Sequence, residues 1–357
     1  MGKVCSFRKG YGIAKDDLSS DGTPCILYGE LYTTYKTAIA KTIKSKTSIQ
    51  SKSLVYSQKD DVIIPCSGET AEDIATSICV PYDGVLLGGD LTVVHSDLDG
   101  AFLSNQINSV RKYDIARIAQ GKSIVHLQAD ELKKIFIFYP SIQEQRKISA
   151  FIDKIDERIE IQNKIIEDLK VLKKELCKVL LNNKEWPKFR IRDIANLGRG
   201  RVINTDEINS QKFPLYPVYS SQTSNNGIMG YLEQYDFEGE YITWTTDGAN
   251  AGTVFYRNGR FNCTNVCGTL KLTVDFDYYI TALSIQMVTE KYVSKNLANP
   301  KLMNNVMAEI EIFMPDIRTQ KNLSNLFLSL DKKIESAGKL LSCFVSEKKF
   351  LLTAMFI

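Results

Sequence analysis

The chain has 357 residues, of which 44% are hydrophobic and 24% charged, and its formal net charge is +3. This length suffices for two globular domains with separate hydrophobic cores, and the composition excludes an intrinsically disordered chain. No apolar run reaches the roughly 18 residues of a membrane span, and residues 1–10 do not resemble a signal peptide, so we expect a cytoplasmic protein. The 8 cysteines are scattered and are expected to be reduced.

The first domain is predicted to span residues 1–139 and to contain both strands and helices. Its short apolar runs predict buried strands at 61–65, 84–87 and 91–94, and residues 102–108 have the pattern of a short helix. Mixed patterns of this kind are typical of an α+β domain.

One segment of this domain, between Glu30 and Asp60, has many lysines and no acidic residue. Lysine can neutralise phosphate, and the interleaved hydroxyl and amide side chains can bond to base edges, so the segment is a candidate DNA contact. A solvated loop would show the same charge pattern, and the stretch Ser67 to Thr70 could equally be a turn stabilised by its own side chains. The candidate DNA-binding residues of the first domain are Lys36, Lys41, Lys44, Lys46, Ser48, Gln50, Ser67 and Thr70.

An internal repeat organises the chain. Residues 135–142 resemble residues 310–317, and the offset of 175 (315 − 140) persists without a gap through the segments that follow. In each copy a short apolar strand leads to a proline, a capping residue and a long helical pattern. The sequence therefore predicts helical regions at 140–184 and 315–357.

The apolar residues of both helical regions recur with heptad spacing. The first seam is interrupted at Gln162 and Lys173, and Lys348 is the repeat equivalent of Lys173 in the second. At 1.5 Å per residue the first region would be roughly 60 Å long, longer than a small domain is wide. We therefore predict that the two helices pair as an antiparallel coiled coil that separates two globular domains and gives the chain a pseudo-twofold repeat. The alternative is two independent helical tails.

The second domain is predicted at residues 185–314 and is again α+β. Its pattern predicts a strand at 241–244 and a β-hairpin at 253–261 with an Asn-Gly turn. A weaker correspondence at an offset of 190 (200 − 10) relates Gly200 to Gly10. The two domains are therefore expected to be diverged copies of one another.

Polar loops of the second domain are the candidates for base recognition. Asn and Gln side chains can bond to adenine, and Arg can bond to guanine. The stretch Thr245 to Gly248 could equally be a local turn. The candidate DNA-binding residues of the second domain are Ser220, Ser221, Gln222, Thr223, Asn225, Asn226, Thr245, Thr246, Asn250 and Arg257.

Catalytic and cofactor motifs are missing from the sequence. It contains no Gly-x-Gly-x-x-Gly, no P-loop and no Asn/Asp-Pro-Pro-aromatic tetrad, so we expect neither S-adenosylmethionine nor ATP to bind. Cys263 and Cys267 have no further ligands nearby, so we expect no metal. Asp60 and Asp61 are interpreted as a surface turn rather than as part of a nuclease centre. The chain is thus expected to have no cofactor and no catalytic site.

Taken together, the order of domains and helices resembles the specificity subunits of type I restriction-modification systems, in which two target-recognition domains alternate with two conserved helical regions. The resemblance covers essentially the whole chain. It implies a protein that reads two DNA half-sites, holds two modification subunits that methylate adenine, and associates with motor-nuclease subunits. The segments that carry it are Phe7–Gly10, Ser67–Ile74, Gly88–Leu91, Pro140–Ile148, Tyr219–Thr223, Asn225–Ile228 and Trp244–Gly248.

Two departures from the family pattern are visible. Members usually have a few more residues before the Gly10 region, so the first domain is expected to lack an edge strand. Gln143-Glu144-Gln145 in the first helical region corresponds to Arg318-Thr319-Gln320 in the second, so contacts made by Glu144 are expected on one side only.

Two other classes of protein remain as alternatives. A fused restriction-methylation enzyme or nuclease would require a catalytic motif. A coiled-coil scaffold without sequence readout would leave the duplicated polar domains unexplained.

Overall fold

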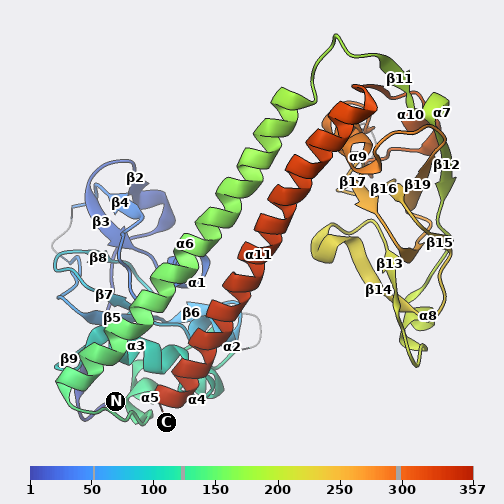
Figure 1. Ribbon diagram of the computed structural model, residues 1–357. Helices are drawn as coiled ribbons and strands as arrows, with labels where there is room; N and C mark the ends of the chain where they lie inside the picture. The colour runs from blue at the N-terminus through green and yellow to red at the C-terminus, as the bar shows by residue number, and fades with distance from the viewer. Residues whose placement is uncertain (51–52, 122–124, 295–298, 357) are drawn as a thin grey trace. The chain divides into compact units, whose positions relative to one another are not determined.

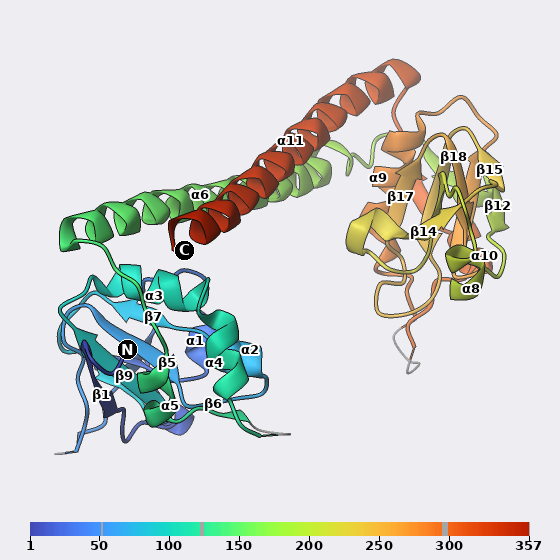
Figure 2. The same ribbon diagram turned by 90° about the horizontal axis from the view of Figure 1, so that it is seen from below.

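The computed structural model describes residues 1–50, 53–121, 125–294 and 299–356 (Figure 1). It divides into two compact units, residues 1–164 with 338–357, and residues 165–337. Each unit contains one α+β domain and one half of each of two long helices (Figures 1 and 2). The α+β fold class expected from the sequence is confirmed.

The first domain contains two four-stranded sheets. One is antiparallel throughout, and in the other strand β3 pairs antiparallel with β4 and parallel with β8. In sheet order the strands are β1 (Cys5–Lys9), β9 (Leu91–Ser96), β5 (Asp61–Pro65) and β7 (Ile78–Val80), then β2 (Leu18–Ser19), β4 (Ser45–Thr47), β3 (Thr23–Ile26) and β8 (Leu86–Leu87). The remaining elements are β6 (Ser67–Gly68) paired with β10 (Val125–His126), the 3-10 turn η1 (Lys15–Asp17), α1 (Glu30–Thr33), α2 (Ala71–Ile74), α3 (Gly100–Asn108), α4 (Lys112–Ile118) and α5 (Ala129–Lys134).

The second domain has the same pair of sheets. In sheet order the strands are β12 (Ala195–Arg199), β19 (Cys267–Leu272), β16 (Tyr241–Thr245) and β17 (Val254–Arg257), then β14 (Ile228–Leu232), β13 (Tyr216–Tyr219), β18 (Arg260–Cys263) and β15 (Phe237–Glu238). The remaining elements are β11 (Lys188–Arg190) paired with β20 (Glu311–Phe313), α7 (Ile191–Ile194), α8 (Thr205–Asn209), the 3-10 turn η2 (Ser224–Gly227), α9 (Tyr278–Thr289) and α10 (Asn304–Ala308).

The topologies of the two domains match strand for strand across most of both sheets. The order β1-β9-β5-β7 corresponds to β12-β19-β16-β17, and β4-β3-β8 corresponds to β14-β13-β18, with the parallel pair at the same place. Strands β1 and β12 begin at residues 5 and 195, which is the offset of 190 seen in the sequence. The domains are therefore diverged copies of one fold.

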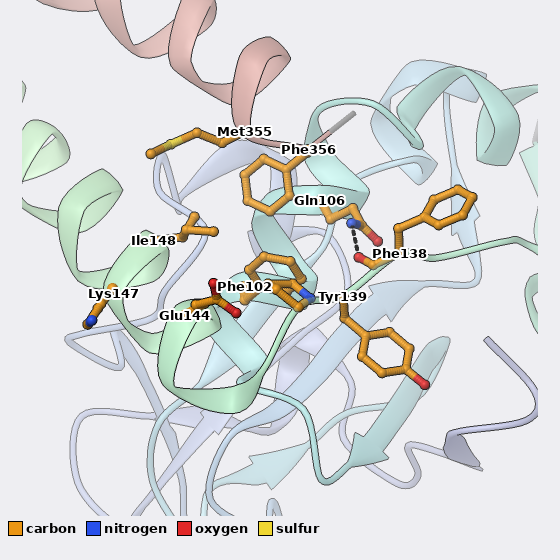
Figure 3. A pocket seen from close by; sticks show the side chains of 10 residues that line it. Phe102, Gln106, Phe138, Tyr139, Glu144, Lys147, Ile148, Met355 and Phe356 are labelled. Carbon is orange, nitrogen blue, oxygen red and sulfur yellow. Dashed lines mark hydrogen bonds between the residues drawn. The ribbon is translucent and has the colours of Figure 1, made fainter.

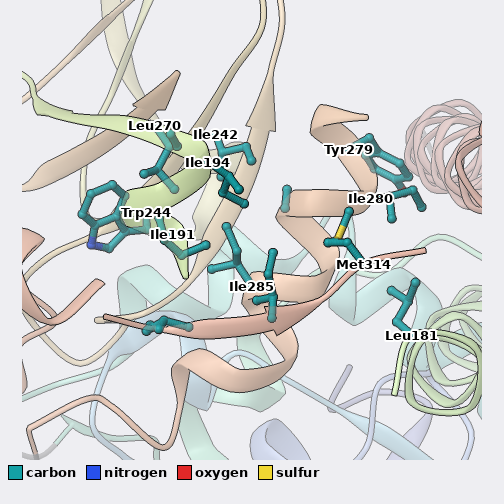
Figure 4. Close-up of a cluster of buried hydrophobic side chains, with 14 of the residues drawn as sticks. Leu181, Ile191, Ile194, Ile242, Trp244, Leu270, Tyr279, Ile280, Ile285 and Met314 are labelled. Carbon is teal, nitrogen blue, oxygen red and sulfur yellow. The ribbon is translucent and has the colours of Figure 1, made fainter. Parts of the chain in front are cut away.

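The core of the second domain lies between helix α9 and the sheet that contains β16 (Figure 4). Trp244 of β16 is fully buried, and its indole nitrogen donates a hydrogen bond of 2.9 Å to the carbonyl oxygen of Leu302. A side chain at Gly268 would lie 2.2 Å from the Trp244 ring, so only glycine fits beside this tryptophan. Close packing of this kind holds β16 in its sheet, and the polar stretch 246–250 follows directly after this strand.

Three local predictions were wrong. Strand β17 pairs with β16 whereas β18 pairs with β13 and β15, so residues 253–261 link two sheets rather than form a hairpin. Residues 135–139 are not a strand, unlike β20 at the equivalent place in the second domain. Strand β20 is held by antiparallel pairing with β11. The predicted strand at 84–87 is shortened to β8.

The two long helices are α6 (Ile142–Leu180) and α11 (Ile317–Met355), each of 39 residues. At the start of α6, Glu144 Oε2 accepts a hydrogen bond of 3.1 Å from the backbone N–H of Ser141. At the start of α11, Asp316 Oδ1 instead accepts a hydrogen bond of 3.0 Å from the N–H of Thr319. Both helices are thus capped, and the contact of Glu144 occurs on one side only, as expected.

Within each unit the helices are joined by equivalent ion pairs. In the first unit Lys348 Nζ lies 2.5 Å from Asp156 Oδ1, and in the second unit Lys173 Nζ lies 2.6 Å from Asp331 Oδ1. Both lysines and both aspartates are related by the offset of 175, and the two contacts exchange the roles of α6 and α11. This exchange confirms antiparallel pairing with pseudo-twofold symmetry. It also explains the two lysines that interrupt the heptad pattern.

The ends of the helices pack in the same reciprocal manner. Leu181, after the end of α6, belongs to the core of the second domain. Its repeat equivalent Phe356, after the end of α11, lies against Phe102 of helix α3 in the first domain, with ring centroids 5.0 Å apart. Each domain therefore contacts both long helices within its own unit.

Candidate nucleic-acid interface

Strand β4 of the first domain and the residues next to it expose one polar face. Lys44, Lys46, Ser48 and Gln50 are exposed, whereas Thr47 is buried and donates a hydrogen bond of 2.6 Å to the carbonyl oxygen of Asp17. This alternation is the period of two of an extended chain. Within the described residues no carboxylate lies within 4.0 Å of the Lys44 or Lys46 ammonium groups, so both charges face solvent.

Lys41 has a different environment from these two lysines. Its ammonium nitrogen lies 2.6 Å from Asp153 Oδ1 and 3.0 Å from Glu157 Oε1, both on helix α6. Burial alone would lower the pKa of Lys41. The hydrogen bonds to the two carboxylates raise it by a larger amount, so the net shift of the pKa is upward. The ammonium group is therefore occupied by the protein, in contrast to the phosphate contact proposed from the sequence. Lys36 is exposed and donates a hydrogen bond of 3.3 Å to the carbonyl oxygen of Thr33.

Ser67 and Thr70 are both bonded to other side chains of the first domain, and only the contacts of Thr70 are local. Thr70 is the N-cap of helix α2, where its Oγ1 accepts a hydrogen bond of 3.1 Å from the N–H of Asp73 and donates one of 2.7 Å to Asp73 Oδ2. Ser67 Oγ lies 3.2 Å from His126 Nδ1. The bonding of Thr70 thus matches the local-turn alternative.

Asp61 is buried rather than part of a surface turn, which corrects the interpretation of Asp60 and Asp61. Its carboxylate accepts hydrogen bonds from Arg8, from His95 Nδ1 at 2.8 Å and from the N–H of Gln58 at 2.8 Å. A buried carboxylate that accepts hydrogen bonds from three protein groups has a structural role. In the described part of the chain no three His, Cys, Asp or Glu residues are grouped as metal ligands.

The loop of residues 220–227 joins β13 to β14 in the second domain and carries several candidates. Asn225 and Asn226 are exposed and have positive φ angles of 47° and 53°, a conformation that asparagine tolerates better than most residues. The Gln222 amide donates to the carbonyl oxygen of Ile228, and Ser220 Oγ accepts a hydrogen bond of 3.4 Å from the N–H of Gln222. Gln222 therefore shapes the loop, and the two asparagines are presented at its tip. Ser221 is partly exposed and Thr223 is exposed.

Arg257 lies beneath this loop and is only 4% exposed. Its guanidinium carbon lies 3.6 Å from the ring centroid of Tyr219 and 4.3 Å from that of Phe255, and its Nε donates a hydrogen bond of 3.3 Å to Thr243 Oγ1. Burial lowers the pKa of Arg257. A side chain at Gly227 would approach its guanidinium to 3.1 Å. Arg257 therefore supports the loop from below, which corrects its placement among surface groups that read bases.

The stretch around Thr245 is held by hydrogen bonds of its own. Thr245 Oγ1 donates to the carbonyl oxygen of Asn250, and the buried Thr246 donates a hydrogen bond of 2.6 Å to Asp247. Arg199 donates one of 3.0 Å to Thr246 Oγ1. The two threonines thus form a local turn, whereas the Asn250 side chain is exposed.

In each domain one connection that carries candidate residues occupies the same place in the sheet topology. Residues 27–44 connect β3 to β4, and residues 220–227 connect the corresponding strands β13 and β14. The sheets match, but these connections differ in length and composition. Both connections carry residues that were predicted from the sequence as candidates. Their equivalence was not predicted, because the flanking strands of the two domains are too different in sequence to be aligned.

A cavity of about 580 Å³ lies beside the first turns of α6 in the first unit (Figure 3). Phe102, Tyr139 and Phe356 contribute aromatic walls, and Gln106 bonds to the carbonyl oxygen of Phe138 at 2.6 Å. The charged residues that line it are Glu144 and Lys147.

All eight cysteines are free thiols, and five of them are buried. Cys343 is the exposed one. None of the helices in the described ranges is long and apolar enough to cross a membrane.

Two α+β domains of one topology, each with a distinct polar connection at the same place, define a duplicated recognition protein. A family model described as the type I restriction modification DNA specificity domain matches residues 1–171 and again residues 183–342. The chain belongs to this family, and its role is that of a type I specificity subunit.

Relatives in mycoplasmas agree with this assignment. A Mycoplasma pneumoniae protein described as a type I specificity subunit is 33% identical over 204 residues, which cover 56% of this chain and 85% of the relative. Another, described as the N-terminus of such a subunit, is 44% identical over 139 residues, 39% of this chain and 74% of the relative. The crystal structure of the type I system S subunit from M. genitalium has the same fold, with a TM-score of 0.67 and 17% identity, covering 100% of this chain and 94% of that one.

Proposed function

We propose that the chain recognises a bipartite target in double-stranded DNA, with one half-site read by each domain. The observation that carries this proposal is the equivalence of residues 27–44 and 220–227 in otherwise matching sheets. Two copies of one fold that differ in their polar connections are suited to bind two different sequences. The helices between them, which match closely, are suited to a common structural role.

The exposed candidates named here are of two chemical kinds, lysines in the first domain and asparagines in the second. Lys44 and Lys46 carry unpaired positive charge in the described structure and would contact phosphate. Asn225, Asn226 and Asn250 present exposed amides, which can bond bidentately to adenine in the major groove. Phosphate contacts fix the position of a protein on DNA, and base contacts give specificity.

The helices support a second part of the proposal, that the chain holds two identical modification subunits. Phe151 and Ile165 of α6 are 46% and 42% exposed, and their repeat equivalents Leu326 and Leu340 of α11 are 40% and 45% exposed. Apolar side chains left exposed at equivalent positions provide two similar surfaces for two copies of one partner. The methyltransferase chemistry, with its S-adenosylmethionine, would belong to these subunits, and motor-nuclease subunits would join the same cytoplasmic complex.

A DNA-binding experiment with the full chain tests the proposal. The chain is titrated into duplexes that contain the adenine-methylated motif of its host, with and without the co-encoded modification subunits. We expect weak binding by the chain alone and specific binding by the complex. Mapping of methylated adenines should show two half-sites separated by a fixed spacer. A complex that assembles but shows no sequence preference would instead identify a coiled-coil scaffold.

A further inference from the structure

A buried glutamine in the first turn of each long helix bonds to the domain that precedes the helix in the chain. Gln145, in the first turn of α6, is 2% exposed, and its Oε1 accepts a hydrogen bond of 3.0 Å from the N–H of Asp99. Its Nε2 donates one of 2.9 Å to the carbonyl oxygen of Pro140. Asp99 is the N-cap of helix α3, where it accepts a hydrogen bond of 2.8 Å from the N–H of Phe102. The glutamine therefore links the start of α6 to the cap of a helix in the domain.

The same bonding occurs in the second unit. Gln320 is fully buried, accepts a hydrogen bond of 2.8 Å from the N–H of Asp277, and donates one of 2.8 Å to the carbonyl oxygen of Pro315. Asp277 is the N-cap of helix α9. The two glutamines are related by the offset of 175, although the domain helices they contact have diverged in sequence. An arrangement kept in both copies while its surroundings differ indicates a shared task.

We infer that Gln145 and Gln320 are positioning residues that fix the orientation of each recognition domain on its helix and thereby restrict the spacing between half-sites. This inference rests on the proposed bipartite recognition. A buried amide that bonds on both sides holds its partners in one geometry, because a rotated domain would leave a buried N–H or C=O unsatisfied. Both glutamines are buried and their bonds lie outside the exposed loops, so they act through the placement of the domain.

The consequence concerns discrimination between spacers. A target with a spacer of the wrong length can be bound only if one domain shifts relative to its helix. The glutamine makes that shift costly, whereas a side chain of the same length without hydrogen bonds would not. Replacement by methionine preserves the length and volume of the side chain and removes both bonds.

The test uses the full chain in complex with its modification subunits. Gln145→Met and Gln320→Met are compared with Gln143→Met and Asn322→Met, exposed positions two residues away on the same helices. Adenine methylation is measured on duplexes whose half-sites are separated by the natural spacer, or by one base pair more or fewer. We expect the ratio of natural to altered spacer to fall by about tenfold in each glutamine variant, because about one buried hydrogen bond no longer opposes the shift. The controls should keep the wild-type ratio.

An unchanged ratio in both glutamine variants, with methylation lowered equally on all duplexes, would overturn the inference and leave a role in stability alone. Should the methionine variants not fold, Gln145→Glu and Gln320→Glu retain the acceptor and lose the donor. Wild-type discrimination in these folded variants would also overturn it. Failure of the proposed function is distinct, because the wild-type complex itself would then methylate no bipartite target.

Discussion

Replacement of Lys348 by methionine should destabilise the protein much more than the equivalent replacement of Lys173. Both lysines pair with an aspartate of the opposite helix, but the side chain of Asp156, the partner of Lys348, is 8% exposed, whereas that of Asp331 is 39% exposed. Removing one partner of a buried pair leaves an uncompensated charge and costs about 3–5 kcal/mol. The exposed carboxylate of Asp331 remains hydrated, so the loss there should be about 1 kcal/mol or less.

The loss at Lys348 should also depend on pH. Burial raises the pKa of Asp156, and the hydrogen bond and the charge of Lys348 lower it by a smaller amount. Replacement of Lys348 removes the hydrogen bond and the charge, so the pKa of Asp156 should rise further in the variant. A carboxyl group whose pKa is higher in the folded than in the unfolded state binds its proton more tightly when the protein is folded. Its ionised form therefore lowers the free energy of unfolding, and this loss grows as pH rises through the folded-state pKa. The destabilisation should therefore be large at about pH 7 and small at about pH 4, near the ordinary pKa of aspartate.

Urea unfolding of wild type and both single variants at the two pH values measures these differences. The double variant Lys348→Met with Asp156→Leu is the control, because it removes both charges and should recover most of the lost stability. Equal losses in the two single variants, or a Lys348→Met loss that does not change with pH, would refute the reasoning from burial.

Three further predictions concern DNA. Changing Lys44 and Lys46 to alanine should reduce the slope of log binding constant against log salt by the equivalent of up to about two released counterions. An unchanged slope in a salt titration would show that the two lysines do not face phosphate. Arg257→Met should weaken methylation at targets of the second domain by at least about tenfold, because the buried guanidinium supports the loop. The dependence of log binding constant on log salt should not change, because Arg257 contacts no phosphate, and a reduced slope would instead indicate that it does. Insertion of one heptad at equivalent positions of both long helices adds about 10 Å, which corresponds to roughly three base pairs. Mapping of methylated adenines should then show a longer spacer, whereas full activity at the original spacer would reject the idea that the helices set the spacing.

The repeat made the helical part of the fold predictable from the sequence. The offset of 175 gave the positions of α6 and α11 and their pairing, because long helices are determined by local capping and heptad spacing. The hairpin at 253–261 could not be predicted correctly, because the partners of β17 and β18 lie in separate parts of the chain. The alternation of apolar and polar residues within a segment does not indicate which distant strand that segment pairs with.

The candidate site was predicted in outline only. All four are basic residues in polar segments, but only Lys44 and Lys46 are both exposed and without an acidic partner in the described structure. Lys41 is exposed but paired with carboxylates of α6, and Arg257 is buried. The difference depends on Asp153, Glu157 and Tyr219, which are far from them in the sequence. Composition predicts which side chains could bind DNA, whereas their accessibility depends on tertiary contacts.

The reciprocal ion pairs have a consequence for shorter polypeptides. One domain with its helix carries both Asp156 and Lys173, and the other carries both Asp331 and Lys348, so each half has a donor and an acceptor for the same contact. A half-length chain would therefore be self-complementary, and two copies could pair through a true twofold axis in place of the pseudo-twofold relation. Such a homodimer would present two identical reading surfaces, which match an inverted repeat rather than two unrelated half-sites.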